Sequence, residues 1–248
     1  MSIDTRSRVC YTMDKSKKED FKMKKVLSLI LAVTLLLGCF TVYSNAALSL
    51  GFKKEEPVYV ATMYVCQMDR NHSLDGHTWI YIKNLTNSTI KVGAYNLPKG
   101  QAVSIGTFGY SIVGPKDGSD PKGLYYNAEN YRYNKAKTFE FAYLEKNLTQ
   151  KQLEKVSNKI LNSNSWSYFR NCTWAAFRIW NTIPGQFCPY LISPLFARLS
   201  ILIYSSHKSD GFKLYNPKAD QIFKQVGNGS GATLTPADAN VPPTATAD

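Results

Sequence analysis

The feature that most constrains the fold of this 248-residue chain is a change in the periodicity of its apolar residues part-way along the sequence. Before the change, short segments rich in β-branched and aromatic residues alternate with turn-forming residues, which is typical of strands. After it, Leu153, Val156 and Ile160 recur at spacings of three and four, which predicts an amphipathic helix over 149–162. Strands followed by helices indicate an α+β fold, with a mainly antiparallel sheet and helices packed on it.

The strand-type segments are predicted to belong to this sheet. The segment 77–83 alternates, with its tryptophan and tyrosine on one face and its two isoleucines on the other. A turn-rich stretch over 84–88 separates it from 89–95, so the two segments are predicted to pair as a β-hairpin. Further strands are expected over 57–68, 102–108, 123–126 and 138–144, and the rest of 109–136 is expected to be a long loop.

Two helices are predicted after these strands. Thr149, with Gln152 three residues later, forms a capping-box pattern at the start of the first helix. A second helix is expected over 172–181, because the segment is apolar and a Pro-Gly breaker follows it. The apolar stretch 191–204 contains a proline and indicates no single kind of element.

The stretch 23–46 has the layout of a secretory signal peptide. A basic start at Met23 is followed by an apolar run over 26–37 and by small residues, with cleavage expected after Ala46 or the next residue. The apolar run is shorter than the roughly 20 residues that a membrane span needs. Residues 1–22, which are polar and mixed in charge, are interpreted as an over-long start.

Two other interpretations of this leader stay open. One is an uncleaved membrane anchor with a short cytoplasmic tail. The other is a lipoprotein, because residues 36–39 resemble a bacterial lipobox, in which Cys39 would be acylated and become the first residue. Each interpretation places the folded part outside the cytoplasm, either secreted or at the cell surface.

By length, residues 55–225 form one domain, and the small residues and prolines of 226–248 predict a flexible tail. Eight of the 30 Lys and Arg residues and four of the 18 Asp and Glu residues lie in 1–46, so the remainder carries a net charge of +8. This charge is compatible with an anionic cell wall or membrane surface. Without a basic run or a basic–aromatic stripe, we expect no nucleic-acid partner. The oligomeric state is not indicated.

Cys172 is the strongest candidate for a chemically active residue. It stands at the predicted start of a helix, where the dipole and the free N–H groups stabilise a thiolate, and Arg170 adds positive charge nearby. A nucleophilic thiol also needs a base. His77 begins a predicted strand directly after a turn, which leaves its ring able to reach across the edge of the sheet.

The segments around these two residues resemble a known family. The sequence GHTWIYIK over 76–83 is similar to the histidine strand, and NCTWAAF over 171–177 to the cysteine helix, of circularly permuted papain-like amidases. These are NlpC-type superfamily members, a group that includes lecithin retinol acyltransferase-like proteins. In them the histidine strand precedes the cysteine helix, as it does here. The resemblance covers about residues 57–181 and implies a cysteine peptidase, amidase or acyltransferase that acts through a thioester.

The resemblance also implies roles for individual residues. Cys172 would be the nucleophile and His77 its general base. The family's third residue orients the imidazole from the strand after the histidine, a region where this chain has no second histidine, and Thr89 is the candidate chosen there. Amide bonds in cell-wall peptides or proteins would be the substrate, with lipid esters as an alternative. No cofactor is expected.

Simpler roles for the same residues stay open. Cys172 would also suit a buried structural position, and an exported chain permits a disulfide between Cys66 and Cys188 or between Cys172 and Cys188. His72 is a rival base. Because Cys66, His72 and His77 do not match a compact zinc spacing, no metal site is expected. The alternative function is a non-catalytic binding or adhesion module, secreted or anchored at the surface.

Overall fold

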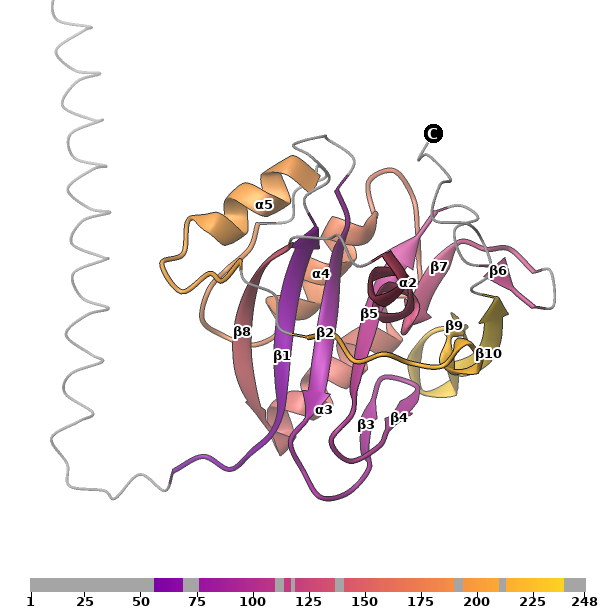
Figure 1. Cartoon of the computed structure of the whole chain (residues 1–248), viewed down its shortest axis with the longest axis horizontal. Coiled ribbons are helices and arrows are strands. Elements are labelled where there is room, and N and C mark those ends of the chain that lie inside the picture. Colours follow the sequence, from indigo (N-terminus) through magenta and orange to yellow (C-terminus); the bar gives the residue numbers. More distant parts are fainter. Residues whose placement is uncertain are drawn as a thin grey trace, which may run out of the picture. The chain divides into compact units, whose positions relative to one another are not determined.

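The computed structural model describes residues 56–68, 76–109, 114–116, 119–136, 141–189, 194–209 and 213–238. Its main strands are β1 (Tyr59–Met68), β2 (Thr78–Asn84), β5 (Ala102–Phe108), β6 (Gly114–Pro115), β7 (Gly123–Tyr126), β8 (Phe141–Thr149), β9 (Phe223–Val226) and β10 (Thr233–Asp238). They form one sheet in the order β6-β10-β9-β7-β5-β2-β1-β8, in which every neighbouring pair is antiparallel. The predicted α+β class with a mainly antiparallel sheet is therefore confirmed (Figure 1).

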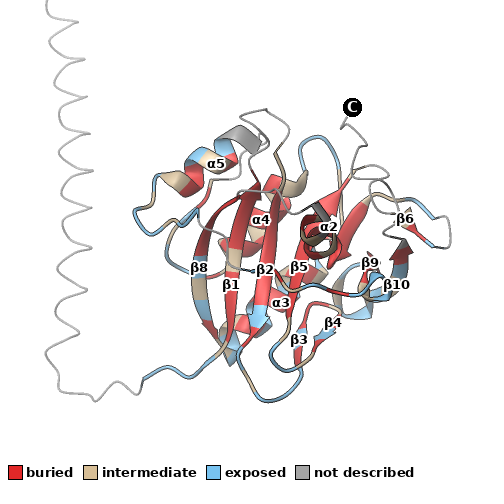
Figure 2. Ribbon diagram, in the orientation of Figure 1, coloured by how far each residue is buried: buried red, intermediate tan, exposed pale blue. Residues whose placement is uncertain are grey.

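The helices cover both faces of this sheet. Helices α3 (Gln150–Leu161), α4 (Cys172–Trp180) and α5 (Pro194–Leu202) pack on one face, against the aliphatic residues of β1, β2 and β8. Helix α2 (Ala128–Ala136) lies on the other face, over β5 (Figure 1). The strands between these layers are largely buried (Figure 2).

The predicted alternation in β2 is confirmed, and it separates two cores. Ile80 and Ile82 belong to the main core beneath α3, α4 and α5. Trp79 and Tyr81 belong to an aromatic cluster on the opposite face, together with Tyr133 of α2. Because side chains alternate along a strand, His77 shares the α2 face with Trp79.

The predicted hairpin between 77–83 and 89–95 is wrong. Strand β2 pairs with β1 on one side and β5 on the other, while β3 (Ile90–Val92) and β4 (Tyr95–Leu97) form their own two-stranded sheet. The buried Asn84 side chain explains the change of direction, since its amide donates hydrogen bonds to the carbonyls of Ser88, Leu97 and Pro98. Those contacts fold the segment after β2 into a separate unit.

Both predicted helices are confirmed. At the start of α3 the backbone N–H of Thr149 donates to the Gln152 side chain over 2.9 Å, which is half of the predicted capping box. The stretch 191–204, left open by its sequence, contains α5, with Pro194 at the first helical position, where a missing N–H costs nothing.

Two stretches expected to lack regular structure contain it. The predicted strand over 123–126 is confirmed as β7, but the rest of 109–136, predicted to be a long loop, holds α2 and β6. The predicted flexible tail 226–248 is wrong for its first part, because a 3-10 turn at Gly229–Gly231 and strand β10 complete the sheet beside β9. Another 3-10 turn, Ala219–Gln221, precedes β9.

Several predictions lie outside the described residues. The over-long start, the signal peptide and the acylated Cys39 all fall within 1–55, and the end of the tail falls within 239–248. From Pro57 onward the described chain forms one compact unit, close to the predicted boundary at residue 55. Among the described helices, none is both long and apolar enough to cross a membrane.

Candidate active site

Cys172 is the first residue of α4, as the sequence predicted. The helix is capped by Asn171, whose side-chain oxygen accepts a hydrogen bond from the Trp174 backbone N–H at 3.2 Å. Buried residues on one side of α4, among them Phe177 and Trp180, fix the helix against the sheet. The sulfur is therefore held at a rigid helix N-terminus, where backbone N–H groups favour a negative charge.

His77 lies directly before β2, and its ring is held between two aromatic side chains. The imidazole stacks on Phe108 with ring centroids 4.7 Å apart, and on Trp79 with centroids 5.9 Å apart. Its side chain is 14% exposed. The ring thus has one orientation, at the rim of the sheet and within reach of solvent.

The structure brings Cys172 and His77 together, and the two side chains are hydrogen-bonded. Burial alone would raise the pKa of the Cys172 thiol, but the charge and the hydrogen bond of His77 outweigh it and lower that pKa below its ordinary value. Burial alone would likewise lower the pKa of His77, but Cys172 and Glu129 raise it to about 9. Both shifts favour a thiolate–imidazolium pair.

Two threonines add to the stabilisation of the thiolate. The backbone N–H of Thr78 and the side chain of Thr173 both hydrogen-bond the Cys172 sulfur, and each contact lowers its pKa. The hydroxyls of Thr78 and Thr173 lie 3.0 Å apart, and the Thr78 hydroxyl also donates to the buried Gln67 side chain. A buried polar chain therefore runs from β1 to the sulfur and fixes its position.

Glu129 of α2 is the residue that sequence reasoning missed. Its Oε1 lies 2.9 Å from His77 Nε2, and its side chain is 1% exposed. With Nε2 engaged by the carboxylate, Nδ1 is left as the ring nitrogen for Cys172. The other oxygen, Oε2, is buried and has no hydrogen-bond partner among the described residues, so His77 is the described side chain that Glu129 contacts by a hydrogen bond. Together, Cys172, His77 and Glu129 form the candidate triad.

Glycine at position 106 makes this approach of α2 to β5 feasible. A Cβ at Gly106 would lie 1.8 Å from Glu129 Oε1 and 3.1 Å from His77 Nε2. Any larger residue would displace the carboxylate. Gly106 therefore belongs to the site, although it carries no chemistry.

The structure does not bring Thr89, the predicted third residue, to this site. Thr89 is exposed and lies just before β3, close to the far end of β2. His77 stands at the other end of this seven-residue strand, which at about 3.3 Å per residue separates them by roughly 20 Å. The choice of Thr89 is therefore wrong, and Glu129 occupies the position beside the imidazole.

The other two described cysteines do not belong to the candidate site. Cys66 and Cys188 are buried, and neither forms a disulfide with the other or with Cys172, so both proposed pairings are wrong. The reason is geometric: Cys66 belongs to the aromatic cluster on one face of the sheet and Cys188 to the main core on the other. His72, the rival base, lies outside the described residues.

A weak sequence signal for Glu129 did exist. Asn127 just before the helix, with an acidic residue in the first turn, is a helix-start pattern. This pattern alone does not predict a helix, because α2 has no apolar periodicity. The helix instead buries polar side chains such as Glu129 and Asn130 against β5.

Comparison of the chain with protein-family models, with curated proteins and with solved structures finds no match. The function proposed below therefore rests on the geometry of the triad and on the sequence itself. A thiol with a lowered pKa, hydrogen-bonded to an imidazole that a buried carboxylate orients, is the arrangement that nucleophilic catalysis by cysteine requires.

Proposed function

We propose that this chain is a cysteine hydrolase, a peptidase or amidase that acts through a thioester at Cys172. The observation that carries the proposal is the hydrogen-bonded sequence from Cys172 through His77 to Glu129. The family resemblance around residues 76–83 and 171–177 points to the same chemistry. The carboxylate of Glu129 supplies an orienting group beside His77, where the sequence pattern offered no second histidine.

The proposed reaction has two steps. In the first, the Cys172 thiolate attacks the carbonyl carbon of an amide, a C–S bond forms, and the carbonyl electron pair moves to oxygen. When that intermediate collapses, the C–N bond breaks and the His77 imidazolium gives its proton to the leaving amine. In the second step, His77 takes a proton from water, the resulting hydroxide attacks the thioester, and the carboxylic acid leaves as the thiolate is restored.

The start of α4 is well placed to stabilise the developing oxyanion. The first N–H groups of a helix have no partner within the helix, and here they lie beside the attacking sulfur. We assign the backbone N–H of Cys172 as the main donor, since Asn171 already occupies the N–H of Trp174.

The proposed substrate class is inferred from the predicted export of the chain and not from the geometry of the site. With a signal peptide at 23–46 and a net charge of +8 beyond it, amide bonds in anionic cell-wall peptides are the proposed substrate class. Ester bonds of lipids would react by the same steps. The location proposed is secreted or cell-surface.

The proposal is tested by the pH dependence of Cys172 alkylation with iodoacetamide. We expect rapid labelling of the peptide that contains Cys172 well below the ordinary thiol pKa of about 8.5. His77→Ala should move the rise in labelling up by one pH unit or more, because His77 provides the charge and the hydrogen bond that lower the pKa of the thiol.

Cys66 and Cys188 are internal controls. Both are buried, and burial raises the pKa of each thiol, so neither should label at neutral pH. If Cys172 labelled no faster than they do, or if His77→Ala left its pH profile unchanged, the hydrolase proposal would be overturned in favour of the binding module.

A further inference from the structure

Three cations and a tryptophan line an open pocket on the outer side of α4. The pocket has a volume of about 510 Å³, and its lining residues are Lys159, Arg170, Trp174 and Arg178. Trp174 and Arg178 are one helical turn apart and share a face of α4, while Lys159 comes from the last turn of α3, which packs alongside.

The pocket is separate from the candidate triad. Two positions along a helix correspond to a rotation of about 200°, so Trp174 points away from the side of α4 on which Cys172 meets His77. The pocket side of α4 is partly exposed, whereas the opposite side is buried in the main core. A ligand in the pocket would therefore lie outside the place where Cys172 reacts.

The two arginines are held close to each other by the indole. The guanidinium of Arg178 lies 4.8 Å from the centre of the Trp174 ring, and that of Arg170 lies 5.7 Å from it. Such cation–π contacts hold the charges in place at a small gain of free energy. They also bring like charges together, which by itself is unfavourable.

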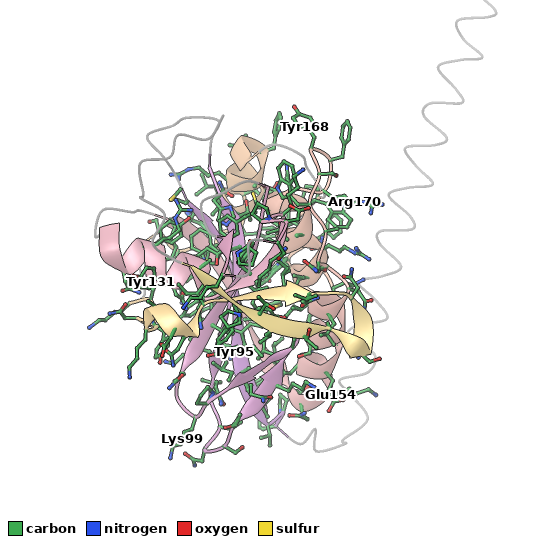
Figure 3. All side chains as sticks on the ribbon, turned by 90° about the vertical axis from the view of Figure 1, so that its right-hand side faces the viewer. Tyr95, Lys99, Tyr131, Glu154, Tyr168 and Arg170 are labelled. Carbon is green, nitrogen blue, oxygen red and sulfur yellow. The ribbon has the colours of Figure 1, made fainter. Side chains whose placement is uncertain are left out.

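No carboxylate among the described residues neutralises this cluster. The ion pairs found among the described residues lie elsewhere, and they join Glu129 to His77 and Glu145 to Lys208. Glu154, also on α3, lies toward the other end of the molecule from Arg170 in Figure 3, and it accepts a hydrogen bond from Gln150. Surface charges of opposite sign are normally interspersed, so three cations in one pocket that no described carboxylate pairs with favour an anionic ligand.

From this we infer that the pocket is a phosphate-binding site. A phosphate group has three terminal oxygens, one for each of the three cations, and arginine forks bind phosphate in a bidentate manner. A carboxylate offers only two oxygens and a single charge. The ligand is therefore a phosphomonoester or inorganic phosphate, since a phosphodiester, like a carboxylate, has only two terminal oxygens and a single charge.

Isothermal titration of the full-length chain with inorganic phosphate at low ionic strength tests the inference. We expect phosphate to bind at least tenfold more tightly than acetate. Arg178→Gln should weaken phosphate binding about tenfold or more, whereas Lys151→Gln, which removes the same charge from an exposed position two turns up α3, should change it less than twofold. Because the pocket is open, 0.5 M salt should weaken binding as well.

Two results would overturn the inference: equal affinity for acetate and phosphate, or an equal loss in the Arg178 and Lys151 variants. Arg178→Lys keeps the charge but loses the paired N–H donors of the guanidinium, so we expect phosphate binding to be partly retained. A melting curve confirms that each variant folds. Glycerol phosphate should also bind more tightly than dimethyl phosphate, because the diester has one terminal oxygen and one charge fewer. Cys172→Ala should still bind phosphate, so failure of this inference is distinct from failure of the hydrolase proposal.

Discussion

Gly106 is the residue whose size most directly limits the candidate triad. It lies on the α2 face of β5, where the carboxylate of Glu129 meets the imidazole of His77. Its φ angle is ordinary, so the reason for glycine there is space and not backbone conformation. Side-chain size at this one position therefore controls whether Glu129 can reach the imidazole.

Gly106→Ala should destabilise the fold and disconnect the triad. The added methyl would lie 1.8 Å from Glu129 Oε1, and forcing such an atom into a packed site costs about 1–3 kcal/mol. Chemical denaturation should show this loss, and Cys172 should alkylate more slowly at neutral pH. Gly114→Ala is the control, because no atom of the described residues lies within 4 Å of its Cβ position. Equal effects of the two substitutions would contradict the proposed role of Gly106.

At the level of single residues, sequence reasoning found Cys172 and His77 but not their partner. Each of these two stands at the boundary of an element with a clear hydrophobic pattern, so its position could be predicted from that pattern. Glu129 could not be found in this way. Its role depends on α2 lying over β5, a long-range contact that leaves no periodic signal in the sequence.

At the level of elements, α2 is the piece that completes the site. The chain enters it through Asn127, a buried residue with a φ of 66°, whose backbone N–H donates to Ser104 on β5 and whose side chain donates to the Gln221 carbonyl. Asn134 fixes the other end by donating to the Tyr215 carbonyl at 2.9 Å. The helix is thus anchored by hydrogen bonds at both of its ends.

Two substitutions of Asn127 separate the stabilisation by its side-chain hydrogen bonds from the effect of its left-handed backbone conformation. Asn127→Gly keeps the left-handed conformation and loses only the side-chain hydrogen bonds, at about 1 kcal/mol. Asn127→Ala should cost about 1–2 kcal/mol more, because a non-glycine residue without a polar side chain is strained there. Urea unfolding would measure both. A larger loss for the glycine variant than for the alanine variant would exclude backbone conformation as the cause.

At the scale of the whole molecule, the sheet is completed by the end of the described chain. Strand β10 lies between β9 and β6, and β9 joins it to β7. The sequence of β10 is rich in small residues and contains Pro236, so it predicts a flexible tail and not a strand. It becomes a strand because β9 offers a paired edge, which is tertiary context rather than local propensity.

Removal of residues 227–248 should therefore destabilise the protein. Strand β9 would lose its ladder to β10, and β6 would lose its only described partner strand. A domain of this size loses about 2–4 °C in melting temperature per kcal/mol, so a drop of several degrees is expected in calorimetry. Truncation after Asp238 leaves β10 in place and should leave the melting temperature unchanged. If both truncations melted alike, β10 would contribute nothing to stability.

The spacing of the triad along the chain has a consequence for how the protein matures. Glu129 follows His77 by 52 positions, and Cys172 comes later still, from a helix on the other side of the sheet. During synthesis or refolding, the Cys172 sulfur meets the His77 imidazole only after α4 has packed against β2, two elements that lie far apart in the sequence. Until then Cys172 is an ordinary thiol. In the proposed hydrolase, the heightened reactivity of Cys172 would thus arise only on completed assembly, and an unfinished chain would carry no activated nucleophile.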